Sequence, residues 1–216
     1  MENKDRPEQV RWYRAATYFD EVHRIMRNLP YETVEQAIEA LLRTHEAGRA
    51  IYLFGNGGSA SLASHFACDL GKGTSDVAIP RFRVISLTDN IPLMTAWAND
   101  LGYEHVFAEQ LKNLVVPGDV AFAISGSGNS PNVLNALRVA KQRGALTVGL
   151  TGFQGGKMKS LCDICIIIPS DNMQIIEDLH LSIAHASFTA IRARMQAAKP
   201  IPAVTETSWS KAASAD

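Results

Sequence analysis

The sequence predicts an α/β fold, in which a parallel sheet is covered by helices on both faces and a helical hairpin precedes it. Apolar runs recur along the chain, and helical stretches separate most of them. These runs are residues 51–54, 82–87, 120–124, 146–150 and 164–168. A chain of 216 residues, 46% of them hydrophobic, is also long enough to form one well-packed domain of this class.

Helical periodicity predicts two helices before the first apolar run. Residues 7–29 repeat apolar side chains near one face, and a second helix is expected over residues 33–47, where Gly48 ends it. A last long helix is expected over residues 173–195. The predicted organisation is therefore N-terminal helices over residues 1–48, the main domain over residues 49–196 and a flexible tail over residues 197–216, which are rich in Ala, Ser, Pro and Lys.

Charge and composition exclude several classes of partner. The formal net charge is −1, so broad electrostatic binding of nucleic acid or of a membrane surface is not expected. The sequence has no apolar run near the length of a transmembrane helix and no secretory segment, so a cytoplasmic location is expected. Cys162 and Cys165 form a C-x-x-C, but this motif runs into an apolar strand and has no second pair, which favours packing over redox or zinc chemistry.

Two polar loops follow apolar runs and predict an anion site. The first, residues 55–59, reads Gly-Asn-Gly-Gly-Ser, and the second, residues 125–130, reads Ser-Gly-Ser-Gly-Asn-Ser. Glycine lets the backbone approach a ligand, and the N–H groups at the start of the following helix favour negative charge. Tight turns with helix caps are the alternative interpretation. Two such loops at strand ends favour one phosphate-sized ligand at the edge of the sheet.

Ionisable side chains in two predicted helices could converge over this loop pair. His65 and Asp69 are four residues apart and share one helix face, and Glu177 and His185 lie near one face of the last helix. If the two helices meet, two imidazoles and two carboxylates would suit a divalent metal or a proton transfer. Spacing alone leaves open a solvated or interhelix polar pair.

At these residues the chain resembles the sugar isomerase (SIS) domain family and, within it, the phosphoheptose isomerases. The resemblance covers residues 31–195 and depends on motifs that agree in order and spacing. They are GNGGSA at 55–60, HFA at 65–67, AND at 98–100, AISGSGNSPNV at 123–133, LTGFQGGKM at 150–158 and E-D-L-H-x-x-x-x-H at 177–185.

The resemblance implies a three-layer αβα sandwich with a five-stranded parallel sheet, assembled as a homotetramer with active sites at subunit interfaces. The substrate phosphate would be held by serines and by the backbone amides of the first loop, and Asp89 would contact sugar hydroxyls. The implied phosphate residues are Asn56, Gly57, Gly58, Ser59, Ser125, Ser127 and Ser130. The implied reaction is ketose–aldose isomerisation through an enediol, with one zinc ion between the two key helices.

The sequence departs from the family pattern at three of these positions. Where the family has His and Glu on the first helix and Gln and His on the last, this chain has His65, Asp69, Glu177 and His185, and a family arginine is replaced by Lys72. His65, Asp69, Glu177 and His185 are the expected metal ligands, and Lys72 is expected to contact the substrate. Asp69 or Glu177 is expected to be the base, Asp69 slightly favoured, with His185 as the partner that handles the second proton.

The departures allow two hypotheses about function. In the first, the altered set is still catalytic, and the chain isomerises sedoheptulose 7-phosphate to a D-glycero-D-manno-heptose 7-phosphate for heptose biosynthesis. In the second, the chain is a non-catalytic sugar-phosphate-binding or regulatory protein, of the kind that associates with a replication initiator. Retention of four ionisable groups in register favours the isomerase, because loss of a base usually leaves apolar or small residues.

Overall fold

The computed structural model describes residues 14–77 and 80–198, and its centre is a five-stranded parallel sheet. The strands lie in the order β2-β1-β3-β4-β5. Their bounds are β1 (Ala50–Gly55), β2 (Arg83–Ser86), β3 (Val120–Ser125), β4 (Leu146–Thr151) and β5 (Ile164–Ile167). Every residue of β1 and β3 is buried, as expected for central strands covered on both faces.

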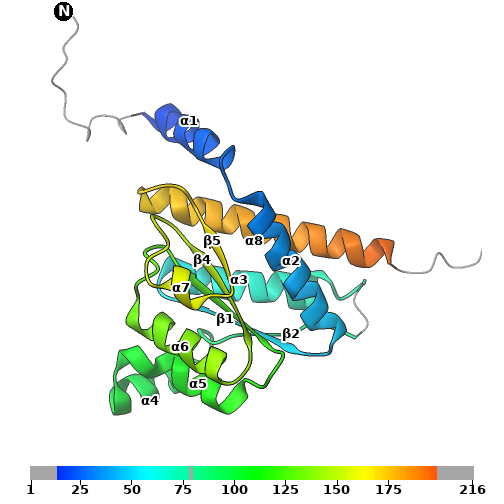
Figure 1. Cartoon of the computed structure of the whole chain (residues 1–216), viewed down its shortest axis with the longest axis vertical. Helices are drawn as coiled ribbons and strands as arrows, with labels where there is room; N and C mark the ends of the chain where they lie inside the picture. Colours follow the sequence, from blue (N-terminus) through cyan, green and yellow to red (C-terminus); the bar gives the residue numbers. More distant parts are fainter. Residues whose placement is uncertain (1–13, 78–79, 199–216) are drawn as a thin grey trace, which may run out of the picture.

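Helices form one layer on each face of the sheet, which confirms the predicted three-layer sandwich (Figure 1). One layer consists of α2 (Tyr31–Glu46), α3 (Gly58–Gly73) and α8 (Met173–Ala197), with α1 (Ala15–Met26) packed at its edge. The other consists of α4 (Ile91–Leu101), α5 (Val106–Leu114), α6 (Pro131–Gln142) and α7 (Met158–Leu161), and a short 3-10 helix, η2 (Tyr103–His105), joins α4 to α5.

The predicted elements agree with the structure to within one or two residues at most boundaries. The N-terminal helix is the main difference: α1 begins at Ala15, and the part of the predicted helix before residue 14 lies outside the described residues. Most of the tail predicted over residues 197–216 also lies outside them, from residue 199 onward. In Figure 1, α1 projects from the body of the molecule, and α2 crosses over α8.

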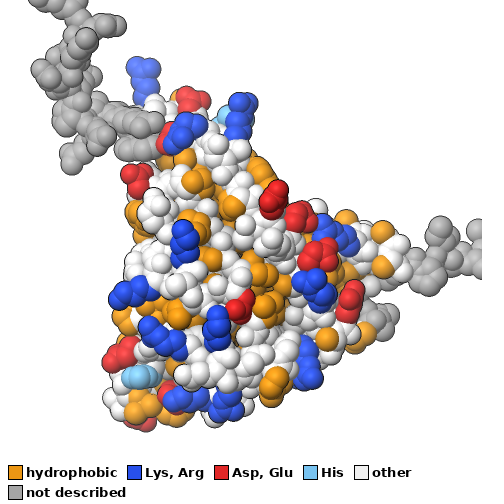
Figure 2. All heavy atoms as spheres, in the orientation of Figure 1, with side chains coloured by type: hydrophobic (Ala, Val, Ile, Leu, Met, Phe, Trp, Pro, Cys, Tyr) orange, Lys and Arg blue, Asp and Glu red, His pale blue; other side chains and the backbone are white. Residues whose placement is uncertain are grey.

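The surface charges agree with the composition. Figure 2 shows positive and negative side chains mixed across the face drawn, with no large area of one sign. Within the described residues, no helix is both long and apolar enough to span a membrane.

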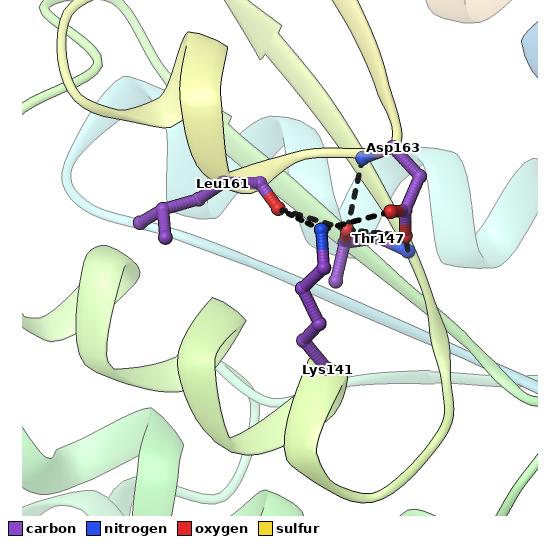
Figure 3. Close-up of polar contacts among 4 residues, drawn as sticks. All are labelled: Lys141, Thr147, Leu161 and Asp163. Carbon is purple, nitrogen blue, oxygen red and sulfur yellow. Dashed lines mark hydrogen bonds and ion pairs between the residues drawn. The ribbon is translucent and has the colours of Figure 1, made fainter.

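A polar cluster at the amino end of β4 fixes the link between α7 and β5 (Figure 3). Asp163 accepts hydrogen bonds from the backbone N–H of Thr147 (2.9 Å) and from its hydroxyl (2.7 Å), and Lys141 reaches the other carboxylate oxygen at 3.0 Å. Lys141 and Thr147 also donate to the carbonyl of Leu161. Burial alone would raise the pKa of Asp163, but the hydrogen bonds from Thr147 and Lys141 lower it below its usual value.

We expect Asp163→Asn to lower the free energy of unfolding by about 1 kcal/mol at pH 7, because the amide cannot accept from both partners. The folded-state pKa of Asp163 is lowered, so the ionised carboxylate stabilises the fold above the unfolded-state pKa, and this effect disappears as pH falls through the folded value. Urea unfolding at pH 7 and pH 3 should show a smaller difference between wild type and variant at pH 3. An equal difference at both pH values would contradict this, and the exposed Asp171→Asn serves as control.

Candidate active site

The first polar loop turns the end of β1 directly into α3. Gly55 pairs with Ile124, and a Cβ at Gly55 would lie 2.6 Å from the Ile124 carbonyl oxygen and 2.7 Å from the Cβ of Ser59. Gly57 has a φ of 55°, a conformation that favours glycine, and α3 begins at the next residue. Ser59 is buried in the first turn of the helix. The loop therefore presents the N-terminal end of α3 at the carboxyl edge of the sheet, beside β3.

The second polar loop lies next to the first, because β3 is the neighbour of β1. Ser125 ends β3, and Ser130 is the N-cap of α6. Their hydroxyl oxygens lie 3.3 Å apart, and the Ser127 hydroxyl accepts from the backbone N–H of Asn129 at 3.2 Å. The two predicted loops are therefore neighbours at the carboxyl edge of the sheet, where hydroxyl groups and the N–H groups of helix starts are donors of the kind that suit a phosphate.

A third segment, residues 152–158, holds the serine loop in place, which the sequence reasoning missed. The backbone N–H of Gly152 donates to the Gly126 carbonyl at 2.9 Å, and that of Met158 donates to the Gly128 carbonyl at 3.0 Å. The side chain of Asn129 accepts from the backbone N–H of Lys157 at 3.1 Å. The only sequence signal for this contact is the Gly-Gly pair of the LTGFQGGKM motif.

The structure brings His65, Asp69 and His185 together where α3 meets α8. The Nε2 atoms of the two histidines are 3.2 Å apart, and Asp69 Oδ2 lies 3.6 Å from Nε2 of His65 and 3.9 Å from Nε2 of His185. Each imidazole is about half exposed, with 49% of its side-chain surface accessible. Asp69 Oδ2 is buried and has no hydrogen-bond partner among the described residues.

These three side chains fit a divalent metal ion. They form the group of potential ligands, found among the described residues, whose donor atoms all lie within 4.8 Å of one another. Donor atoms around a tetrahedral zinc ion, with bonds of about 2.0–2.1 Å, lie roughly 3.3 Å apart, close to the separations seen here. The unpartnered Asp69 oxygen is the kind of atom that a metal would satisfy, and three protein ligands leave a position open.

Glu177 does not join this group. Its carboxylate lies over the glycine loop, 3.1 Å from the position that a Cβ at Gly58 would take. It lines a cavity of about 220 Å³ together with Ser59, His65 and residues of α8. The four side chains predicted from spacing therefore occur as a trio, of which His65 lines this cavity, and as a separate carboxylate, Glu177, at the N-terminus of α3.

Two other predicted site residues lie away from this cavity. Asp89 follows β2 and accepts a short hydrogen bond from the hydroxyl of Ser64, and it lines a second hollow, beside the exposed edge strand β2. Lys72 is exposed in the last turn of α3 and takes part in no ion pair found among residues 14–77 and 80–198.

His180 lines the cavity although spacing indicated only a structural or interfacial role. It is 1% exposed, and burial lowers its pKa to about 4, against an opposing effect of the Thr151 backbone, so its ring is neutral at pH 7. The C-x-x-C pair lies elsewhere: the sulfur atoms of Cys162 and Cys165 both pack against the space left by Gly149, between β4 and β5. This position agrees with a packing role.

Comparison with known proteins identifies the family. The sequence profile of the SIS domain matches residues 17–152. The chain belongs to the SIS domain family. It is 40% identical over 163 residues to a phosphoheptose isomerase of Bradyrhizobium sp. (strain ORS 278), covering 76% of this chain and 82% of that relative. It is 44% identical over 149 residues to that of Bradyrhizobium sp. (strain BTAi1 / ATCC BAA-1182), covering 69% and 75%.

A solved structure gives the same result for the fold. The phosphoheptose isomerase of Neisseria gonorrhoeae superposes with a TM-score of 0.77 at 32% identity, covering 82% of this chain and 96% of that one. The motif-based prediction of the SIS family and of its phosphoheptose isomerase branch is thereby confirmed.

We expect Gly128→Ala to destabilise the protein far more than Gly48→Ala. Both glycines have nearly the same φ, 64° and 65°, so an alanine is strained equally at each backbone. A Cβ at Gly128 would lie 2.3 Å from the Gly155 carbonyl oxygen, whereas one at Gly48 meets no atom within 4 Å. Overpacking at Gly128 should therefore lower the free energy of unfolding by about 1–3 kcal/mol more than the change at Gly48 does. Chemical unfolding measures the difference, and equal losses would contradict the close approach of Gly128 to the Gly155 carbonyl.

Proposed function

We propose that the protein is a phosphoheptose isomerase that converts sedoheptulose 7-phosphate to D-glycero-D-manno-heptose 7-phosphate. The observation that carries the proposal is the trio of His65 and Asp69, on the helix that starts from the glycine loop, with His185 of α8. The relatives at 40–44% identity, each called phosphoheptose isomerase, supply the substrate and the reaction type.

In this proposal the phosphate binds between the two polar loops. Ser59, Ser125, Ser127 and Ser130 donate from their hydroxyl groups, and the backbone of residues 56–58 adds N–H groups at the N-terminus of α3. The sugar then extends from the loops along α3 toward the trio. The exposed Asp89 and Lys72 would reach the sugar only in an assembly in which a second copy covers the site.

At the other end of the sugar, one carboxylate moves a proton between carbons. The ketose gives up a proton from C1 to the base, an enediol forms, and a proton returns at C2 to give the aldose. Asp69 is the proposed base because its buried oxygen faces two imidazoles, and His185 exchanges the proton of the neighbouring oxygens. Glu177 is the second candidate for the base, since it lines the same cavity as Ser59.

We further propose that the metal is one zinc ion per subunit, held by His65, Asp69 and His185. Glu177, the fourth ligand expected from the sequence, lies over Gly58 and outside this group. Two imidazoles and a carboxylate are a common zinc donor set. When bound, zinc would polarise the carbonyl and hydroxyl oxygens of the substrate as a Lewis acid.

A homotetramer is the proposed assembly, with each site completed by a neighbouring copy. The cavity of about 220 Å³ is smaller than most ligand pockets, and both imidazoles are half exposed beside it. Large apolar side chains are exposed on several elements around the body, which supports a covered surface. They include Phe19 on α1 (65% exposed), Ile85 on β2 (45%) and Ile91 on α4 (67%).

Proton NMR in D₂O with sedoheptulose 7-phosphate tests the proposal directly. We expect aldose signals in which C2 carries deuterium, because the enediol is reprotonated from solvent, and a lower rate after chelation that added zinc restores. If the sugar phosphate raises thermal stability but neither product nor exchange appears, the protein binds this sugar without catalysing its isomerisation. A panel of other ketose phosphates would then separate a pure binding protein from an isomerase with another substrate.

Substitution of Asp69 and of Glu177 shows which of these two carboxylates is the base and which affects zinc binding. We expect Asp69→Asn to reduce kcat by at least about a hundredfold, the usual contribution of a general base, and to weaken zinc binding. Glu177→Gln should keep the zinc content and retain measurable C1–H exchange. Asp76→Asn, which removes a surface carboxylate paired with Arg192, is the matched control and should keep full turnover. Normal turnover by Asp69→Asn would assign the base to Glu177, provided that Glu177→Gln abolishes exchange.

A further inference from the structure

A pair of side-chain amides joins the glycine loop to the helix that follows the serine loop. Asn56 donates from Nδ2 to Asn132 Oδ1 at 3.0 Å, and Asn132 donates from Nδ2 to Asn56 Oδ1 at 2.8 Å. Asn56 is the second residue of the glycine loop, and Asn132 lies in the first turn of α6, two residues after Ser130. Asn132 is only 2% exposed. The pair therefore fixes the distance between the two loops.

The direction of these hydrogen bonds is set by the backbone. The N–H of Val133 donates to Asn132 Oδ1 at 2.9 Å, so this atom must be the oxygen of the Asn132 amide. The other amide atom, Nδ2, is therefore the one that can donate to Asn56. Asn56 then presents its nitrogen to Asn132 Oδ1 and its oxygen to Asn132 Nδ2. An aspartate at position 132 could not donate, and two oxygens would then face each other.

A third side chain completes the arrangement from a different element. The hydroxyl of Tyr103, in η2, donates to Asn56 Oδ1 at 3.0 Å. The Tyr103 side chain is otherwise at the surface, since the residue is 53% exposed. The η2 backbone is held to α6 by a hydrogen bond from Asn135 to the Glu104 carbonyl, at 3.0 Å. Tyr103 thus contributes a single directed hydrogen bond to the loop.

We propose that Asn132 and Tyr103 are positioning residues for the reaction, and that they act through Asn56 to hold the glycine loop at the spacing that a phosphate group requires. This inference rests on the proposed function. Asn56 uses its side chain in this network, so its contribution to the phosphate is its backbone. The backbone carbonyl of Asn56 accepts from the N–H of Ser59 at 3.0 Å, so a shift of Asn56 would also move the Ser59 hydroxyl.

The test is a steady-state comparison of full-length Tyr103→Phe and Asn132→Ala with wild type. Loss of one hydrogen bond worth about 1 kcal/mol predicts an increase of about fivefold in the KM for sedoheptulose 7-phosphate in Tyr103→Phe. Asn132→Ala removes two bonds to Asn56 and should raise KM by at least about tenfold. In both variants kcat should change by less than about twofold, because the trio that carries the chemistry is not touched.

Tyr31→Phe is the matched control. Tyr31 is 56% exposed, and its hydroxyl also donates one hydrogen bond, to the Met26 carbonyl at 2.7 Å, between α1 and α2. Its KM should equal that of wild type. Equal KM values for Tyr103→Phe and Tyr31→Phe would overturn the inference, as would a loss confined to kcat.

A direct binding measurement separates failure of this inference from failure of the proposed function. If wild type does not isomerise sedoheptulose 7-phosphate, the proposed function fails, and calorimetric titration with inorganic phosphate then tests the inference by itself. Weaker phosphate binding by Tyr103→Phe and Asn132→Ala than by wild type and Tyr31→Phe supports it. The same affinity in all four proteins, or no binding by wild type, overturns it.

Discussion

The close approach of β1, β3 and α3 at Gly55 is the constraint on which the rest of the site depends. A side chain at this position would overlap both the Ile124 carbonyl and Ser59, so only glycine lets the chain leave β1 and enter α3 without moving away from the sheet. This tight turn puts the N-terminus of α3 beside the end of β3. The two polar loops are neighbours because the strands that carry them are neighbours.

The contact between α3 and α8 depends on small residues in a similar way. A Cβ at Gly73 would lie 2.6 Å from the ring of Phe188, and Ala63 and Ala184 are buried in the same core. These small side chains allow the two helix axes to come close together. The donor atoms of His65 and His185, far apart in the sequence, consequently lie 3.2 Å apart. Larger side chains between α3 and α8 would leave His65 and His185 too far apart to share one ion.

Sequence patterns were sufficient for the parts of the site that follow from strand order and helix periodicity. The apolar runs placed all five strands, and the i, i+4 spacing of His65 and Asp69 correctly put both on one helix face. The position of Glu177 could not be derived in this way, because its distance from the trio depends on the crossing of α3 and α8. The hydrogen bond from Ser64 to Asp89, and the one from Tyr103 to Asn56, depend on rotamers and on packing between elements distant in the chain.

In the proposed site, the carboxylate of Glu177 places a negative charge beside the positive end of α3. The N-terminus of α3 carries a partial positive charge, and Glu177 lies over it at Gly58. A phosphate held by the backbone of residues 56–58 would be attracted by this helix end and repelled by Glu177, whereas Ser125 and Ser130 offer hydroxyl groups at the start of α6. For the proposed substrate, this repulsion would favour a phosphate bound toward the serine loop and a carbonyl end on the side where Glu177 lies. Replacement of an amide by a carboxylate at position 177 would in this way strengthen the orientation of the substrate.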